Sequence, residues 1–226
     1  MTNATKQRSR GKRILIIAAW LLLVPAAAAA IVYGPDLVNL VQLGREVEQI
    51  SSEETRVAGP WPRATDACIG CHGDQGNARA QTYPRLAGQP EAYLKNQLHA
   101  FASGARNDPT MTPLALSMTE QERDAFAGHF AKMKAQPNTT FSGDPARVAR
   151  GEAVAKANNC TSCHGQALEG KDAYPRLAGQ GYDYLRDQLM RFKDGTRRDA
   201  TGAMQALTAG LSQQDIDDLA QYMASR

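Results

Sequence analysis

Residues 68–89 read CIGCHGDQGNARAQTYPRLAGQ, and residues 160–180 read CTSCHGQALEGKDAYPRLAGQ. The segment Tyr83–Gln89 recurs without a change as Tyr174–Gln180, and the cysteines and the histidine before it recur as well. A seven-residue identity inside an ordered series of matches indicates a duplicated domain. The two tandem domains that we predict are residues 60–140 and 141–226.

Both copies carry the residue pattern of helices, and neither shows the alternation typical of a strand. Apolar residues at helical spacing predict one helix in each copy, at residues 90–103 and 181–194. Thr119 and Ser212, each followed three residues later by an acidic residue, predict the N-cap of a final helix in each domain. The fold class that we predict is therefore all-α.

The two copies differ before their first cysteine. Residues 147–158 predict a helix that leads into the second CxxCH motif, whereas the matching stretch of the first copy contains Pro60 and Pro62. Proline is poorly tolerated inside a helix because it lacks the N–H group and its ring clashes with the preceding turn. We therefore expect a shortened helix at the start of the first domain.

The N-terminus has the composition of a membrane-spanning segment. Residues 14–33 carry no charge, and a helix of this length, at about 1.5 Å per residue, spans the hydrocarbon core of a bilayer, roughly 30 Å. The basic residues before it favour a cytoplasmic N-terminus, with the domains in the periplasm of a bacterium. We predict a basic tail and one transmembrane helix at 1–33, anchored in the inner-membrane bilayer, and a stalk or linker at 34–59. The alternative is a secretory signal cleaved among residues 26–30.

The positive charge of the chain is concentrated in this N-terminal tail. The formal net charge is +3, and taking away the five basic residues of positions 1–33 leaves −2 for the remainder. A protein that binds nucleic acid needs a basic surface on its folded part. The composition therefore excludes nucleic acid as a partner of the two domains.

All four cysteines lie in two CxxCH motifs. This motif is typical of covalent attachment of c-type haem, in which two thiols add to the vinyl groups and the adjacent histidine binds the iron. Zinc held by thiolates and histidines is the alternative, but it would not explain the other repeated segments. We predict two covalently attached haem c groups, held by Cys68, Cys71 and His72 and by Cys160, Cys163 and His164.

A low-spin c-type iron needs a second axial ligand, for which a methionine thioether is a common choice. Met111 and Met204 follow their histidines by 39 and 40 residues, at matching positions of the repeat. For an ordinary methionine the alternative is packing in the core. We predict that these two methionines bind iron, opposite His72 and His164.

A ligating histidine normally donates its second ring N–H to a fixed acceptor. The backbone carbonyl groups of Pro84 and Pro175, in the repeated segment after each histidine, are candidates for this acceptor. Arginines can pair with haem propionates, although surface placement is the alternative for each. The candidate arginines are Arg85 and Arg176, and also Arg106 and Arg197.

The two CxxCH motifs, the repeated YPRLAGQ and YLxxQLxxF segments and the downstream methionines resemble the cytochrome c4 family of di-haem class I cytochromes c. The resemblance covers residues 58–226. It implies two small all-α cytochrome domains, with a histidine and a methionine on each iron and the proline carbonyl as the acceptor of the histidine. The residues that it assigns are His72, Met111 and Pro84, and His164, Met204 and Pro175.

The resemblance also implies an electron carrier and not an enzyme. Members of this family pass electrons to terminal oxidases, often from a quinol–cytochrome c reductase, so we expect these membrane redox complexes as partners in a respiratory chain. One alternative is a fixed electron-wire subunit of an oxidase or dehydrogenase complex. Another is a di-haem peroxidase, which would need an open coordination position on one iron. Matching methionines in both copies argue against the peroxidase.

Overall fold

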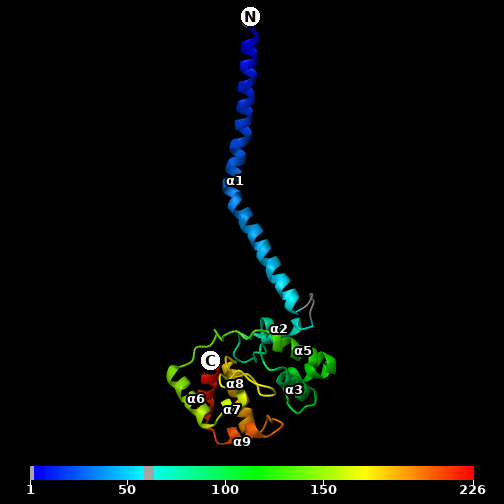
Figure 1. Ribbon diagram of the computed structural model, residues 1–226, viewed down its shortest axis with the longest axis vertical. Coiled ribbons are helices and arrows are strands. Elements are labelled where there is room, and N and C mark those ends of the chain that lie inside the picture. Colours follow the sequence, from blue (N-terminus) through cyan, green and yellow to red (C-terminus); the bar gives the residue numbers. More distant parts are fainter. Residues whose placement is uncertain (1–2, 59–63) are drawn as a thin grey trace. The chain divides into compact units, whose positions relative to one another are not determined.

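The computed structural model describes residues 3–58 and 64–226, in two compact units of which the first ends at Arg63. Within the described residues every regular element is a helix, apart from one β-bridge between Lys171 and Tyr174. The prediction of an all-α fold is confirmed (Figure 1).

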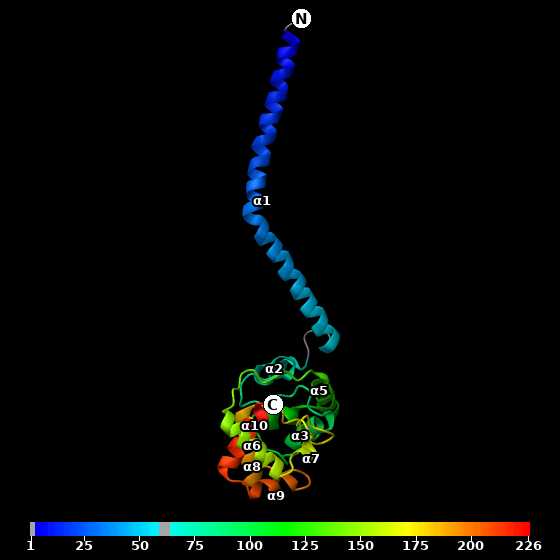
Figure 2. The same ribbon diagram turned by 60° about the vertical axis from the view of Figure 1, so that its left-hand side comes forward.

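The described part of the first unit is one long helix, α1 (Asn3–Ala58), which continues through the boundary that the sequence suggested at residue 33. Pro25 and Pro35 lie inside the helix, and it bends near its middle (Figure 2). An interior proline removes a backbone hydrogen bond and bends a helix in this way. The stretch Trp20–Glu46, with a mean hydropathy of 1.8, is long and apolar enough to cross a membrane by length and composition.

The second unit begins with the helices of domain 1. Helix α3 packs against both α4 and α5, and Leu94 of α3 and Phe130 of α5 belong to a small apolar core. The helix predicted at residues 90–103 is confirmed as α3. The elements of this domain are α2 (Asp66–His72), the 3₁₀ turn η1 (Asp74–Gly76), α3 (Glu91–Ala102), α4 (Met111–Ser117) and α5 (Glu120–Lys132).

Domain 2 repeats this order of helices and adds one helix before it. The last helix, α10, packs against α6 and α8, and α9 packs against α8. The helices predicted at 147–158 and 181–194 are confirmed as α6 and α8. The helices of this domain are α6 (Pro145–Ala157), α7 (Thr161–His164), α8 (Tyr182–Lys193), α9 (Ala203–Ala209) and α10 (Gln213–Ala224).

Both final helices begin with a capping box, as the sequence predicts. The Oγ1 atom of Thr119 accepts from the backbone N–H of Glu122 at 3.2 Å, and the Glu122 carboxylate accepts from the backbone N–H of Thr119 at 2.7 Å. Ser212 and Asp215 make the same pair of bonds at 3.1 and 2.8 Å. These reciprocal bonds satisfy backbone donors that a helix start otherwise leaves free.

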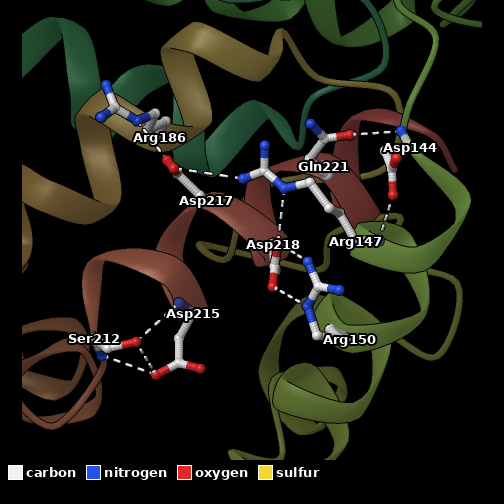
Figure 3. Close-up of polar contacts among 9 residues, drawn as sticks. All are labelled: Asp144, Arg147, Arg150, Arg186, Ser212, Asp215, Asp217, Asp218 and Gln221. Carbon is white, nitrogen blue, oxygen red and sulfur yellow. Dashed lines mark hydrogen bonds and ion pairs between the residues drawn. The ribbon is translucent and has the colours of Figure 1, made fainter.

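Helix α6 approaches α10 closely because Gly151 has no side chain. A Cβ atom at this position would stand 2.0 Å from the backbone oxygen of Asp218. The side chain of Asp218 is 3% exposed and lies 2.9 Å from Nε of Arg147 and 2.7 Å from Nε of Arg150 (Figure 3). Two arginines of α6 thereby compensate a carboxylate that α10 buries.

The electrostatics of this contact favour the charged carboxylate. Burial alone would raise the pKa of Asp218, but the hydrogen bonds and positive charges of Arg150 and Arg147 outweigh burial and lower it. Arg147 also reaches Asp217 at 3.4 Å, and Asp217 binds Arg186 of α8 (Figure 3). The ion pairs therefore connect three helices of domain 2.

In the described part of domain 1, one of these ion pairs has a counterpart and the buried carboxylate has none. Asp124 and Lys95, 3.6 Å apart, stand where domain 2 has Asp217 and Arg186. Ala125 of α5 stands where α10 has Asp218 in the repeat. Helix α5 buries two residues, Ala127 and Phe130, whereas α10 buries eight. Pro60 and Pro62 lie outside the described residues, so the shortened first helix of domain 1 stays a prediction.

Candidate functional site

His72 is the last residue of α2 and is 7% exposed. Its Nδ1 atom lies 2.8 Å from the carbonyl oxygen of Pro84. Because a carbonyl oxygen only accepts, Nδ1 carries the proton and donates it, which leaves Nε2 to bind a metal. The chain turns sharply after the motif at Gly73, where φ is +75° and a Cβ atom would lie 2.4 Å from the backbone oxygen of Asn77.

His164 of α7 repeats this arrangement. It is 6% exposed, and its Nδ1 donates to the carbonyl oxygen of Pro175 at 2.9 Å. The ring of Tyr174 lies edge-on to the imidazole, with the centroids 6.2 Å apart. Burial lowers the pKa of both His72 and His164, and the carbonyl hydrogen bond offsets this only in part. Both imidazoles are therefore held in the neutral form that binds metal ions.

Each of the four cysteines is half-buried beside its histidine, and none forms a disulfide. Burial, helped by the charge of Asp66, raises the pKa of Cys68, and burial raises the pKa of Cys160. Zinc binds thiolates, and the described residues contain no group of three or more His, Cys, Asp or Glu side chains that could hold a metal ion together. The zinc alternative therefore finds no site in this part of the chain.

Met111 and Met204 occupy the first turns of α4 and α9 and are half-buried. Their backbone positions are fixed in the same way. The Oδ1 atom of Asp108 accepts from the N–H of Met111 at 2.9 Å, and Oδ1 of Asp199 accepts from the N–H of Met204 at 3.0 Å. The sequence analysis assigned no role to these aspartates, although both recur in the repeat.

Large apolar side chains lie exposed on the segments that carry the candidate ligands. Folded domains rarely leave several such side chains uncovered next to one another. A porphyrin is a large and mostly apolar ring, so these residues fit a haem in each domain. The exposed residues are Ile69, Tyr83, Leu114 and Leu116 in domain 1, and Tyr174 and Leu207 in domain 2.

The arginines of the repeated segment differ in their surroundings. The guanidinium group of Arg85 donates to the carbonyl oxygens of Ala78 at 3.1 Å and Gln136 at 2.6 Å, and to Oδ1 of Asn77 at 3.1 Å. This group thus braces the end of domain 1. For Arg176 the contacts that bear on the interface come from its backbone.

The two repeated YPRLAGQ segments bind each other across the domain boundary. Gln89 is 4% exposed, and its amide both donates to the carbonyl oxygen and accepts from the N–H of Arg176, each at 2.9 Å. Gln180, also 4% exposed, makes the matching bonds to the backbone of Arg85 at 3.0 and 2.6 Å. The repeated segment is therefore part of the interface between the domains.

A second set of crossed bonds involves Arg106 and Arg197. Arg106 donates to Tyr184 at 3.1 Å and to Gln188 at 2.8 Å, both in the other domain. Arg197 donates to the matching tyrosine and glutamine of domain 1 at 3.3 and 3.0 Å. In the described chain no carboxylate lies within ion-pair distance of either guanidinium group. We call these six residues the interdomain cluster: Tyr93, Gln97, Arg106, Tyr184, Gln188 and Arg197.

The positive charge is felt inside the interdomain cluster. Burial raises the pKa of the Tyr93 hydroxyl. At Tyr184 burial acts in the same direction, but the guanidinium groups of Arg106 and Arg197 outweigh it and lower the pKa to about 8. The two guanidinium groups thus place positive charge beside both hydroxyl groups, and at Tyr184 this charge outweighs burial.

Comparison with known proteins gives the same picture of two related domains. The family model "Cytochrome c" matches the chain twice, at residues 63–137 and 148–226. Cytochrome c4 of Thiocapsa roseopersicina is 34% identical over 172 residues, which cover 71% of this chain and 88% of the relative. A thiosulfate dehydrogenase electron acceptor of Stutzerimonas stutzeri is 34% identical over 196 residues, covering 81% and 89%.

A solved structure agrees with these relatives. Reduced recombinant cytochrome c4 from Pseudomonas stutzeri superposes with a TM-score of 0.66 at 30% sequence identity, over 71% of this chain and 94% of that one. Two CxxCH motifs in two cytochrome c domains carry two covalent haem c groups, and the relatives of this type are electron carriers and not enzymes. The chain thus belongs to the cytochrome c family, as a di-haem electron carrier of the cytochrome c4 type.

Proposed function

We propose that this carrier is anchored in the bacterial inner membrane and passes electrons from a quinol–cytochrome c reductase towards a terminal oxidase. The observation that carries this proposal is the duplicated ligand arrangement, in which His72 and His164 each donate to a proline carbonyl. Two matched sites in one body suit a protein that accepts an electron at one end and releases it at the other.

In this proposal each iron has two protein ligands, His72 with Met111 and His164 with Met204, and each haem is attached through its own pair of cysteines. A bound haem supplies the one-electron couple, and the chain holds it and excludes water from it. Ligands on both faces leave no open position for a substrate, which speaks against the peroxidase alternative. Met ligation is expected to set both potentials at the positive end of the range for haem proteins.

The interdomain cluster is the proposed location of the propionate groups. Arg106 and Arg197 bring two positive charges to the domain boundary, and the described chain offers them no carboxylate. Charge-assisted bonds between guanidinium and carboxylate groups are among the strongest in proteins. Propionates at this position would bring the two haems close to the same boundary. The guanidinium group of Arg85 bonds only to oxygens of its own domain, whereas Arg106 and Arg197 each reach across the boundary. Bracing is therefore the role that we favour for Arg85.

Helix α1 supports retention of the membrane anchor. Cleavage among residues 26–30 would leave a new N-terminus followed by exposed apolar side chains, including Ile31 at 77% and Leu40 at 65% exposure. A retained helix places these side chains in lipid instead. The periplasmic location of the two domains then follows from the basic N-terminus.

Intact mass spectrometry of the protein purified from membranes tests these assignments. A full-length chain, allowing for loss of Met1, plus two haems is the expected mass. A chain that starts within residues 27–31 and carries two haems would show that the protein is a diffusible periplasmic carrier. A mass without haem would contradict the electron-transfer proposal altogether.

A second candidate function is electron uptake from a thiosulfate dehydrogenase. It is favoured by the match to the electron acceptor of Stutzerimonas stutzeri, which extends over 81% of this chain against 71% for the c4 relative of Thiocapsa. In that case the chain would be the dedicated partner of a dehydrogenase. It would then be either a fixed subunit of the dehydrogenase complex or a mobile carrier that the dehydrogenase reduces. Reduction by each donor, followed in a stopped-flow spectrometer, and purification in mild detergent distinguish these possibilities.

A further inference from the structure

The last carbonyl groups of the methionine-bearing helix receive a cation in both domains, but the two cations come from different helices. In domain 1, Nη1 of Arg123 donates to the carbonyl oxygens of Ala115 at 3.1 Å and Met118 at 2.5 Å. In domain 2, the carbonyl of Leu211, which matches Met118, accepts from Nζ of Lys193. In both domains a positively charged side chain thus caps this helix, but it is an arginine of α5 in domain 1 and a lysine of α8 in domain 2.

Arg123 takes the place of a core residue. In the repeat it matches Ile216, which is 0% exposed in domain 2. The Nε atom of Arg123 is buried and has no hydrogen-bond acceptor. A charged side chain therefore lies between α4 and α5 at a position that the other domain fills with an aliphatic side chain.

The two carboxylates next to Arg123 in the sequence are engaged elsewhere. Glu122 accepts from the backbone N–H and the hydroxyl of Thr119 at 2.7 and 2.8 Å. Asp124 lies 3.6 Å from Nζ of Lys95. Among the residues that the structure describes, no carboxylate lies within ion-pair distance of Arg123, so the two carbonyl dipoles are the nearest protein groups that offset its charge.

The positive charge of Lys193 is screened more than that of Arg123, so it contributes less to the electrostatic potential inside its domain. Lys193 extends from the end of α8 to the carbonyl oxygens of Ala209, at 3.2 Å, and Leu211. Its bond to Ala209 is exposed to solvent, whereas both carbonyl bonds of Arg123 are partly buried. Asp215 also lies near enough for its charge to be felt by the lysine. Water and the carboxylate screen a charge in this position more than they screen Arg123.

We infer that Arg123 is a positioning residue that raises the reduction potential of the domain 1 haem relative to that of the domain 2 haem. Oxidation of the iron adds one positive charge to the haem, and a poorly screened guanidinium group on the same helix pair disfavours that charge. Arg123 also fixes the end of α4, the helix that begins at Met111. The inference rests on the proposed ligand role of Met111.

The consequence is an uneven distribution of the electron in the half-reduced protein. Two haems with the same ligand set would share it nearly equally. With Arg123 in place, the electron resides on domain 1 more often than the ligands alone would dictate.

The test uses the full-length protein with both haems and two neutral variants, Arg123→Ile and Arg123→Gln. Ile is the residue of domain 2, and Gln keeps a hydrogen-bond donor for the carbonyl groups of Ala115 and Met118. We expect both variants to lower the potential of domain 1 and to leave that of domain 2 unchanged, whereas Arg123→Lys stays near wild type. Lys193→Met is the matched variant of domain 2, with a smaller expected fall in that domain.

The potentials are read separately for each domain, from the methionine methyl resonances of the two haems during a mediated redox titration. Unchanged domain 1 potentials in both neutral variants would overturn the inference. So would equal shifts in Arg123→Gln and Arg123→Lys, because packing and not charge would then be responsible. Absence of methionine methyl signals from the wild-type protein would instead contradict the proposed ligands. These failures are therefore distinguishable from one another.

Discussion

Domain 1 and domain 2 position their candidate iron ligands with the same hydrogen bonds, but their helices pack differently. In both, a histidine donates to a proline carbonyl and an aspartate accepts from the N–H of the methionine. In domain 2, α10 buries eight residues and is joined to α6 by a buried carboxylate, whereas α5 of domain 1 buries two. The ligand contacts are local in sequence, so they tolerate large differences in the packing around them.

Replacement of an axial ligand has the largest expected effect and tests whether the two sites are equivalent. Met204→His should lower the potential of domain 2 and abolish its thioether–iron absorption at the red edge of the visible spectrum, because methionine favours the reduced iron. Met111→His should do the same in domain 1 alone. Visible spectra and mediated titrations measure both effects.

Met190→Leu is the control for these variants, because Met190 is a partly buried methionine of α8 that packs on the core. Its spectrum should equal that of the wild type. An unchanged spectrum in Met204→His would remove Met204 from the iron.

A methyl group added to a glycine should destabilise domain 2, at the contact between α6 and α10, but not domain 1. Gly151→Ala places Cβ against the backbone of Asp218 and is expected to cost about 3 kcal/mol through overpacking. Gly128→Ala in α5 meets nothing closer than 3.7 Å and should instead stabilise the chain by roughly 0.5 kcal/mol, the usual gain in a helix. Urea unfolding of both variants gives the comparison, and equal effects would refute the close crossing.

Loss of the buried carboxylate should weaken domain 2 only. Asp218→Asn removes the negative charge and replaces one of the two acceptor oxygens by an NH2 group. Arg147 and Arg150 are partly in water, so we expect a loss of about 2 kcal/mol at neutral pH. Because the pairing lowers the pKa of Asp218, its stabilisation is complete above about pH 4 and disappears as the pH falls through the folded-state pKa.

Unfolding of the wild type and of Asp218→Asn should therefore converge at acid pH. The exposed pair of Asp187 with Arg191 is the control, and Asp187→Asn should change stability by less than about 0.5 kcal/mol. A constant difference between wild type and Asp218→Asn from pH 7 to pH 2 would show that charge is not the cause.

Removal of the helix caps has the smallest expected effect, and an equal one in the two domains. Thr119→Ala and Ser212→Ala each remove one acceptor for a backbone N–H, at a cost of about 1 kcal/mol. Thermal unfolding monitored by circular dichroism measures both. A clearly larger loss for Ser212→Ala would mean that the caps, too, depend on the surrounding packing.

The sequence predicted well what depends on neighbouring residues. The all-α class and the helix starts at Thr119 and Ser212 follow from short patterns, and the structure bears them out. The carbonyl groups of Pro84 and Pro175 lie where the histidine acceptors were expected.

What could not be predicted depends on residues far apart in the chain. The repeated segment ends in Gln89 and Gln180, and nothing in one copy indicates that these side chains bind the other copy. The same holds for Arg147 and Arg150, whose buried partner lies about seventy residues away. The roles of Asp108 and Asp199 are local, but an aspartate before a helix is too common a residue to identify them. The end of helix α1 could not be predicted either. The apolar pattern stops near residue 33, but the helix continues to Ala58, because a change in polarity does not mark where a helix ends.

The crossed contacts of Gln89 and Gln180 make the boundary between the domains self-complementary. Each copy offers the other the same backbone groups and receives the same side chain in return, which is the geometry of an isologous dimer. A single ancestral domain with this face would have paired with a second copy of itself about a two-fold axis. Joining two such copies in one chain makes their association independent of concentration, and it allows the two halves to differ in sequence.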